Sequence, residues 1–221
     1  MNYIHSLDTE AVTNYLAETI SSHLAAGERV LWILSGGSGG KVCIEVAKRL
    51  TTPLTKLVTT LSDERYVAVG DPNENWQQLI DGGFSVPGAL TYRPLQGRDR
   101  AETAADLGVW MQQQFLLADF KIGIFGMGTD GHTAGLKPGT SAVEASGWVT
   151  DFSGNDFERI TMTFDAIKQL DEAVIQAMGA DKTAVLNTFI KQDIPITLQP
   201  AQVLKLVNKS TLFTDYKENT L

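Results

Sequence analysis

The sequence predicts an α/β protein with a doubly wound, mostly parallel sheet and helices on both faces of that sheet. Two observations predict this class: short apolar runs alternate with segments of helical apolar spacing, and glycine-rich turns separate them. Strands that are joined through helices run parallel, because each connection crosses over the sheet. A chain of 221 residues can bury a sizeable core without disulfides or metals, so we expect a single domain over residues 1–221.

The first part of the chain contains two helix candidates and two strand candidates. Residues 9–26 have apolar side chains at helical spacing, and residues 29–34 form a nearly continuous apolar run, typical of a strand covered on both faces. Residues 35–40, SGGSGG, predict a turn. Helical spacing returns over residues 41–50, and residues 56–61 predict the second strand.

The rest of the chain repeats this order with variations. A long helix is predicted over residues 101–117, and a strand follows over residues 120–125. Further strands are predicted over residues 159–164, 173–178 and 212–214. A helix over residues 181–190 follows the second of these. Ligands of doubly wound sheets collect at the carboxyl ends of the strands, so the turns that follow strands are the candidate sites.

Charge and cysteine content exclude several classes of function. The net charge of -8 argues against nucleic-acid and membrane partners, because basic patches supply that affinity. A small anionic ligand is still compatible, since local donors and cations can outweigh a distant acidic surface. The single cysteine, Cys43, lies within a helical apolar pattern, which predicts a buried thiol rather than a disulfide or a zinc ligand.

Neither a signal peptide nor a membrane-spanning segment is indicated. The first ten residues lack the basic and then apolar layout of a secretory signal, and no apolar run is long enough to cross a bilayer. We therefore expect a cytoplasmic protein. No group of His, Cys, Asp or Glu has the spacing of metal ligands, so we expect no metal site.

The SGGSGG turn between a strand and a helix is the first candidate site. Glycines allow several N–H groups to face an anion, and the following helix adds its positive end. The alternative is a flexible turn without a ligand. The residues expected to contact the anion are Ser35, Gly36, Gly37 and Ser38.

The second candidate is the loop GMGTDGHTA, which follows a buried strand. His132 lies two residues after Asp130, and Gly128 permits close approach of a ligand. Histidine is the side chain best suited to proton transfer near neutral pH. The alternative is a loop histidine whose ring is bonded to a backbone carbonyl.

The third candidate is the run SDERYV. Asp63 and Glu64 could hold a sugar hydroxyl, and Arg65 could bind a phosphate or carboxylate through two hydrogen bonds. The alternative is a solvated charge cluster at the end of a strand. Two more cations complete the set: Arg159 precedes ITMTF, and Lys182 lies at a helix start, where a bound anion would offset the helix dipole.

In this order the motifs resemble the 6-phosphogluconolactonase family, which shares its fold with the glucosamine-6-phosphate isomerases and deaminases. The matching stretches are SGGS, SDERYV, GDPNEN, GMGTDGH, RITMT and GADK. The resemblance implies a modified doubly wound fold without metal or cofactor. It also implies hydrolysis of 6-phospho-D-glucono-1,5-lactone to 6-phosphogluconate in the pentose phosphate pathway.

The residues fit this implied chemistry. A lactone is an activated ester, so a water activated by His132 can attack it without a covalent nucleophile. Asp130 would orient the imidazole or hold a sugar hydroxyl, and Arg65 would lie near the lactone carbonyl. The remaining expected contacts, to the phosphate, are those of Arg159, Lys182 and the SGGS stretch.

Two departures from the family pattern bear on the choice of activity. The isomerases have a glutamate five residues after the histidine, where this chain has Lys137, and this favours the lactonase. The lactonases usually have Ser-Leu-Phe-Pro where this chain has Gly-Leu-Lys-Pro. They also usually have SGGSTP where this chain has SGGSGG, and the two extra glycines predict a less preorganised loop. A glucosamine-6-phosphate isomerase or deaminase, or a sugar-phosphate-binding homologue with little catalysis, are the alternatives. We expect a monomer or a homodimer.

Overall fold

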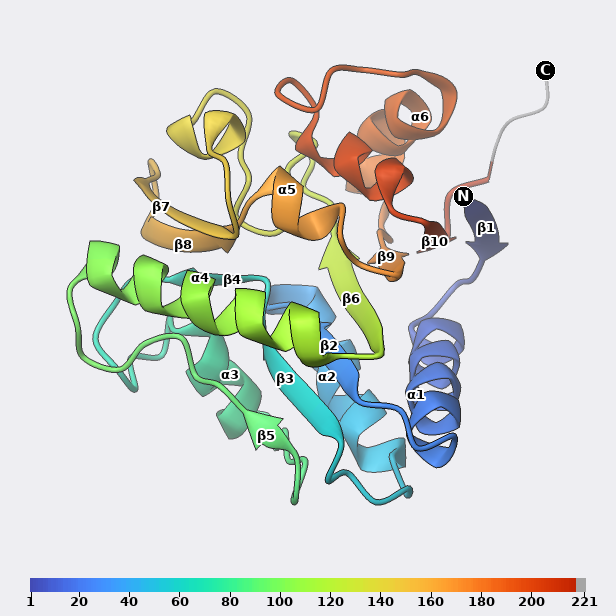
Figure 1. Cartoon of the computed structure of the whole chain (residues 1–221). Helices are drawn as coiled ribbons and strands as arrows, with labels where there is room; N and C mark the ends of the chain where they lie inside the picture. The colour runs from blue at the N-terminus through green and yellow to red at the C-terminus, as the bar shows by residue number, and fades with distance from the viewer. Residues whose placement is uncertain (218–221) are drawn as a thin grey trace.

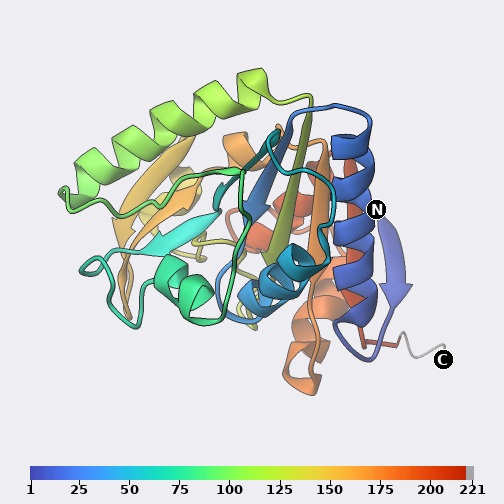
Figure 2. The same cartoon turned by 90° about the horizontal axis from the view of Figure 1, so that it is seen from below.

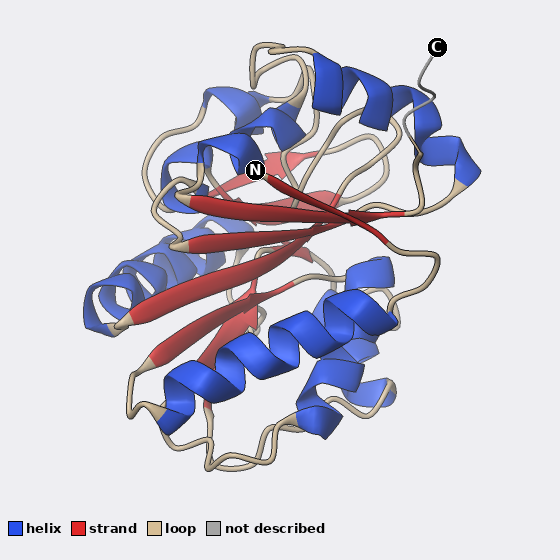
Figure 3. Cartoon of the chain, turned by 90° about the vertical axis from the view of Figure 1, so that its right-hand side faces the viewer, coloured by secondary structure: helices blue, strands red, loops and turns tan. Residues whose placement is uncertain are grey.

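A computed structural model describes residues 1–217 and contains a layer of strands between two sets of helices (Figure 3). The main sheet has the strand order β1-β10-β9-β6-β2-β3-β5, and all neighbouring strands are parallel. Its strands are β1 Asn2–His5, β2 Val30–Leu34, β3 Leu57–Leu61, β5 Leu90–Thr91, β6 Phe120–Gly126, β9 Glu172–Gln176 and β10 Lys209–Thr214. The predicted α/β class is therefore confirmed.

Helices cover both faces of this sheet (Figures 1 and 2). One face carries α1 Glu10–Ala25, α2 Gly37–Arg49 and α3 Asn75–Asp81. The other carries α4 Arg100–Leu117, α5 Phe164–Ile167 and α6 Thr183–Lys191. Side chains of strand β2 alternate between the two helix layers. Leu31 and Ile33 pack on the α4 side, while Val30, Trp32 and Leu34 pack on the α1 side. Within residues 1–217, no helix is long and apolar enough to cross a membrane.

A second, three-stranded sheet lies beside the first. Its order is β4-β8-β7, with β4 Asp63–Arg65, β7 Val149–Ser153 and β8 Glu158–Met162, and both pairs are antiparallel. The strand predicted over residues 159–164 therefore exists, but it does not belong to the parallel sheet. It follows β7 through a short hairpin turn, and such a turn allows only antiparallel pairing.

The boundaries of the other predicted elements shift by a few residues, except at α2. This helix begins at Gly37, inside the segment predicted as a turn: Gly36 is extended, Gly37 has a φ of 55°, and Gly39 and Gly40 already belong to the helix. The sequence analysis missed the strands β1, β4, β5 and β7 and the helices α3 and α5. β1 is an edge strand with mostly exposed side chains, and α3 is short and largely polar, so neither has a clear apolar period. Cys43 is buried in α2, as predicted.

The order of the strands fixes where a ligand can bind. β2 has β6 on one side and β3 on the other, and β9 lies next to β6. The chain therefore leaves the ends of β2 and β6 in opposite directions across the sheet, which opens a crevice at the carboxyl edge.

Candidate active site

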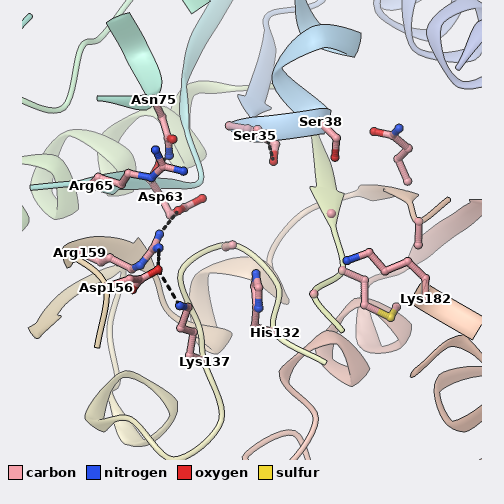
Figure 4. Close-up of a pocket in the computed structure, with 18 of the residues that line it drawn as sticks. Ser35, Ser38, Asp63, Arg65, Asn75, His132, Lys137, Asp156, Arg159 and Lys182 are labelled. Atoms are coloured by element: carbon pink, nitrogen blue, oxygen red, sulfur yellow. Dashed lines mark hydrogen bonds and ion pairs between the residues drawn. The ribbon is translucent and has the colours of Figure 1, made fainter. Parts of the chain in front are cut away.

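A cavity of about 380 Å³ occupies this crevice (Figure 4). It is lined by residues from the carboxyl ends of β2, β6 and β9, from β4 and β8, and from the loops that follow them. These are the turns that the sequence analysis selected, and most of the predicted site residues line the cavity. The predicted residues among its walls are Ser35, Gly36, Gly37, Ser38, Asp63, Arg65, Gly128, His132, Arg159 and Lys182.

The upper wall is the start of α2. The first N–H groups of a helix have no acceptor within the helix. The residues at the start of α2 line the cavity, and its first turn has no acidic residue. Gly36 must be small, since a Cβ there would lie 2.5 Å from Cγ of Asn75. Gly39, expected to loosen the loop, is buried in the first turn, where a Cβ would lie 2.8 Å from Cβ of Ser35. The arrangement suits an anion.

The loop after β6 holds a histidine in a defined orientation. Nδ1 of His132 lies 2.6 Å from Oδ1 of Asp130, and the same oxygen accepts a hydrogen bond from the His132 backbone N–H at 3.1 Å. A carboxylate can only accept, so in the neutral ring Nδ1 carries the proton and Nε2 has the lone pair. Burial raises the pKa of Asp130, but the N–H and the charge of His132 outweigh it, so that this pKa lies below its usual value. The ring is therefore held as a base.

The backbone of this loop leaves little room for larger residues. A Cβ on Gly128 would lie 2.1 Å from Nδ1 of His132, and a Cβ on Gly131 would lie 2.7 Å from Cγ of Gln199. Gly131 also has a φ of +81°, which disfavours other residues. Ala134, on the cavity wall, has a φ of 47°, a strained conformation for a residue other than glycine. Close packing thus fixes the position of the imidazole.

Two arginines form the opposite wall. Arg65 on β4 pairs directly with Arg159 on β8, and both face the cavity. Arg159 contacts Asp156 at 2.8 Å and Asp63 at 3.7 Å. Burial raises the pKa of Asp63 above its usual value, while the charge of Arg159 opposes this shift. The wall therefore joins two guanidinium groups with two carboxylates.

Glu64, predicted to bind the ligand, does not line the cavity. Its carboxylate is fully buried and accepts hydrogen bonds from the backbone N–H groups of Arg65 at 2.7 Å, Asn75 at 2.6 Å and Trp76 at 2.9 Å. These bonds tie β4 to the start of α3. Glu64 thus positions the elements around the site and is unavailable to a ligand.

The two cations predicted to bind one phosphate do not lie together. Figure 4 shows Lys182 and Arg159 on opposite sides of His132, with the start of α2 above them. Lys182 is at the N-terminal end of α6, and its Nζ lies 3.7 Å from Oδ2 of Asp181. The cavity therefore has two separate cationic regions, one at Lys182 and one at the arginine pair.

Nine of the lining residues were not predicted as site residues, and four of these have polar or charged side chains: Asn75, Lys137, Asp156 and Gln176. Asn75 donates to the backbone oxygen of Asp63 at 3.1 Å, Lys137 contacts Asp156 at 3.0 Å, and Gln176 ends β9. Oε1 of Gln176 is buried without a partner among the described residues, although the side chain reaches the cavity wall. The sequence did offer a signal for Gln176, namely a polar residue at the end of an apolar strand. It offered none for Asp156, whose position depends on its contact with Lys137 in another loop.

The charges of the cavity differ from those of the chain. Four cationic side chains line it, Arg65, Lys137, Arg159 and Lys182, against the carboxylates of Asp63 and Asp156. The whole chain has a net charge of -8. Among residues 1–217 no group of three His, Cys, Asp or Glu could hold a metal ion. The cavity thus combines an oriented base with groups that attract an anion.

Comparisons with known proteins agree with this chemistry. A family described as glucosamine-6-phosphate isomerases/6-phosphogluconolactonase matches residues 7–213. The chain is 29% identical over 188 residues to a 6-phosphogluconolactonase of Rhizobium meliloti, which covers 80% of each chain. It is 30% identical over 189 residues to a 6-phosphogluconolactonase of Mycobacterium leprae, which covers 76% of this chain and 75% of the relative.

Solved structures show the same fold. A 6-phosphogluconolactonase from Thermotoga maritima has a TM-score of 0.80 at 21% identity, over 96% of this chain and 98% of its own. A monomeric glucosamine-6-phosphate deaminase also reaches 0.80, at 17% identity and 97% coverage of both chains. The fold alone therefore does not separate the two activities.

The close contact at Gly128 generates a first prediction. Gly128→Ala should displace the imidazole, because its Cβ would overlap Nδ1 of His132 and lie 2.5 Å from Oδ1 of Asp130. The downfield proton signal of Nδ1–H, measured by NMR and assigned with a His132→Gln variant, should then be lost. Gly126→Ala, at the end of β6 just before this loop, is the matched control, since a Cβ there meets no atom within 4 Å. A Gly128→Ala protein that keeps this signal would contradict the packing argument.

Proposed function

Because the chain belongs to the family of glucosamine-6-phosphate isomerases and 6-phosphogluconolactonases, we propose that it hydrolyses 6-phospho-D-glucono-1,5-lactone to 6-phospho-D-gluconate. The observation that carries this proposal is the Asp130–His132 pair. Its geometry supplies one oriented general base in a cavity that attracts anions, and the hydrolysis of an activated ester requires little more. The reaction is a step of the pentose phosphate pathway.

In this proposal the base acts on a water molecule. Nε2 of His132 accepts a proton from the water as the water oxygen attacks C1 of the lactone. The bond between C1 and the ring oxygen then breaks, and the ring oxygen takes the proton back from Nε2 of the imidazolium to become the 5-hydroxyl, which restores the base. The acid that forms at C1 releases its proton to solvent. Asp130 keeps Nδ1 protonated throughout and stabilises the imidazolium that forms.

The two cationic regions divide the substrate between them. We assign the phosphate to the start of α2, with Ser35, Ser38 and the N–H groups of the first turn, and to Lys182. We assign the lactone end to Arg65 and Arg159, where a guanidinium can stabilise the negative charge that develops on the carbonyl oxygen. The position of Arg159 across the cavity from Lys182 supports this division. Binding of the remote phosphate then orients C1 toward the base.

The neighbourhood of Lys137 favours the lactonase over the isomerase. The isomerase relay requires a carboxylate five residues after the histidine. Lys137 supplies a cation there, and its Nζ is paired with Asp156 at 3.0 Å. Hydrolysis needs one base and one water, so this substitution leaves the lactonase route intact.

The location and assembly follow from the same proposal. A phosphorylated sugar lactone is charged and does not cross membranes freely, so we place the reaction in the cytoplasm. A single chain supplies every group that the proposed mechanism uses, so we propose that a monomer can carry out the reaction, with a homodimer as the alternative.

The proposed function is tested by two assays side by side. The protein should hydrolyse freshly generated 6-phosphogluconolactone faster than the spontaneous background, and it should release no ammonia from glucosamine 6-phosphate. Ammonia release would support the deaminase instead. Affinity for a sugar phosphate without turnover of either substrate would support a binding homologue.

The role of the base generates a second prediction. His132→Ala should lower the rate of the chemical step by about 10²–10⁴-fold, because the general base is lost, while the affinity for 6-phosphogluconate changes little. Rates are measured with the spontaneous hydrolysis subtracted, and affinity is measured by calorimetry. Activity within a few-fold of the unmodified protein would remove His132 from the mechanism.

The role of the phosphate contact generates a third. Lys182→Ala should weaken the binding of 6-phosphogluconate by about 1.5–3 kcal/mol, the range of a hydrogen bond to a charged group. Hydrolysis of unphosphorylated gluconolactone should be insensitive to the change, which makes it the internal control. An equal loss with both substrates would mean that Lys182 acts on the fold or at C1.

A further inference from the structure

The hairpin turn between β7 and β8, residues 154–157, lies against the arginine wall of the cavity. Neither the proposed reaction nor the sequence motifs assign it a role. Two of its side chains, Asp156 and Phe157, contact groups from two other parts of the chain, β4 and the loop after His132, as well as β8 itself. The turn therefore has contacts that its own hairpin does not require.

The arginine pair poses an electrostatic problem. Arg65 and Arg159 are direct cross-strand partners, and like charges placed opposite each other on antiparallel strands destabilise the pairing. Nε of each arginine is buried and has no hydrogen-bond partner among the described residues. Nη1 of Arg65 donates a hydrogen bond to the backbone oxygen of Asn73 at 3.2 Å. Other contacts are needed to hold both guanidinium groups toward the cavity.

Asp156 supplies one of these contacts. Its Oδ2 accepts from Nη2 of Arg159 at 2.8 Å and from Nζ of Lys137 at 3.0 Å, while Oδ1 accepts from the N–H of Phe157 at 2.9 Å. Burial raises the pKa of Asp156, but the hydrogen bonds from Arg159 and Lys137 more than reverse this, so the group stays ionised. One carboxylate thus bridges β8 and the loop that carries the base (Figure 4).

Phe157 supplies the other contact. The guanidinium carbon of Arg65 lies 4.9 Å from the centre of its ring, and that of Arg159 lies 5.8 Å from it. Both distances fall within the range of a cation–π contact. The negative face of one ring is therefore close to both of the charges that repel each other.

We propose that Asp156 and Phe157 are positioning residues, which hold Arg65 and Arg159 in the orientation that the lactone end of the substrate requires, with Lys137 as the anchor of Asp156. This inference rests on the proposed function. It assigns Lys137 a structural task in the site: the lysine fixes the carboxylate that orients Arg159.

A simpler alternative is that the Lys137–Asp156 ion pair is only a structural link between two segments, which we call a tether. The Lys137–Asp156 pair could merely join the hairpin turn to the loop after His132, without acting through Arg159. Exchanging the two charges separates these roles. In a Lys137→Asp/Asp156→Lys protein the ion pair between the two segments is restored, but Arg159 faces a lysine instead of a carboxylate.

The experiment measures kcat and KM for lactone hydrolysis, together with the melting temperature. Asp156→Asn should lower kcat by roughly 10- to 100-fold, the effect of a small misplacement of a group that acts in the transition state, with KM within about threefold. Asp156→Glu should recover part of the loss. Phe157→Leu, which keeps an apolar side chain without a ring, should cost about 2- to 5-fold. The exchanged pair should stay as slow as Asp156→Asn.

Glu45→Gln is the matched control, because it removes an exposed ion pair of 2.7 Å to Lys48 outside the cavity. It should leave kcat and KM unchanged. Recovery of full activity in the exchanged pair would overturn the positioning role in favour of the tether. Losses that are equal in the Asn and Glu variants and follow the melting temperature would overturn it in favour of general stability.

The outcome also separates this inference from the function on which it rests. If the unmodified protein does not hydrolyse the lactone, the proposed function fails, and this inference fails with it. If the unmodified protein is active and Asp156→Asn stays within about twofold of it, only the positioning role is overturned.

Discussion

The parallel pairing of β2 with β3 on one side and β6 on the other determines where the functional groups of this chain can lie. Because these strands run in the same direction, their carboxyl ends share one edge, and the connections leave that edge in opposite directions. The start of α2, the loop of His132 and the arginine wall then surround one cavity although they are far apart in the sequence. Fully buried residues such as Trp32 hold this arrangement, so the geometry of the site depends on the core of the sheet.

The fold and the main loops of the site were predictable because their signals are local. A strand buried on both faces must be apolar throughout, and the glycines of the His132 loop stand where backbone and side chains approach closely. The position of Glu64 was predicted wrongly because the sequence analysis did not identify strand β4. Side chains alternate along a strand, so once Asp63–Arg65 is β4, Asp63 and Arg65 face the cavity and Glu64 must face away.

Other parts of the site depend on contacts between distant segments, which sequence spacing does not report. Nothing near Lys182 in the sequence places it across the cavity from Arg159, because that separation follows from the sheet order and from the antiparallel position of β8. The bridge from Asp156 to Lys137 joins two loops and has no sequence signature of its own. The pattern thus identified which turns matter, and the tertiary structure decided which side chains meet.

The contrast between an acidic chain and a cationic cavity has a consequence for the encounter with substrate. A phosphorylated ligand at a distance meets the field of a molecule with a net charge of -8, whereas within the crevice it meets the lysines and arginines. Dissolved salt screens the distant repulsion first, because the Debye length is about 10 Å at 0.1 M ionic strength, while contacts inside the crevice are screened less. Moderate ionic strength should therefore speed the association of an anionic substrate. Salt has the opposite effect where a net attraction steers the ligand to its protein, because it then screens the attraction and slows association.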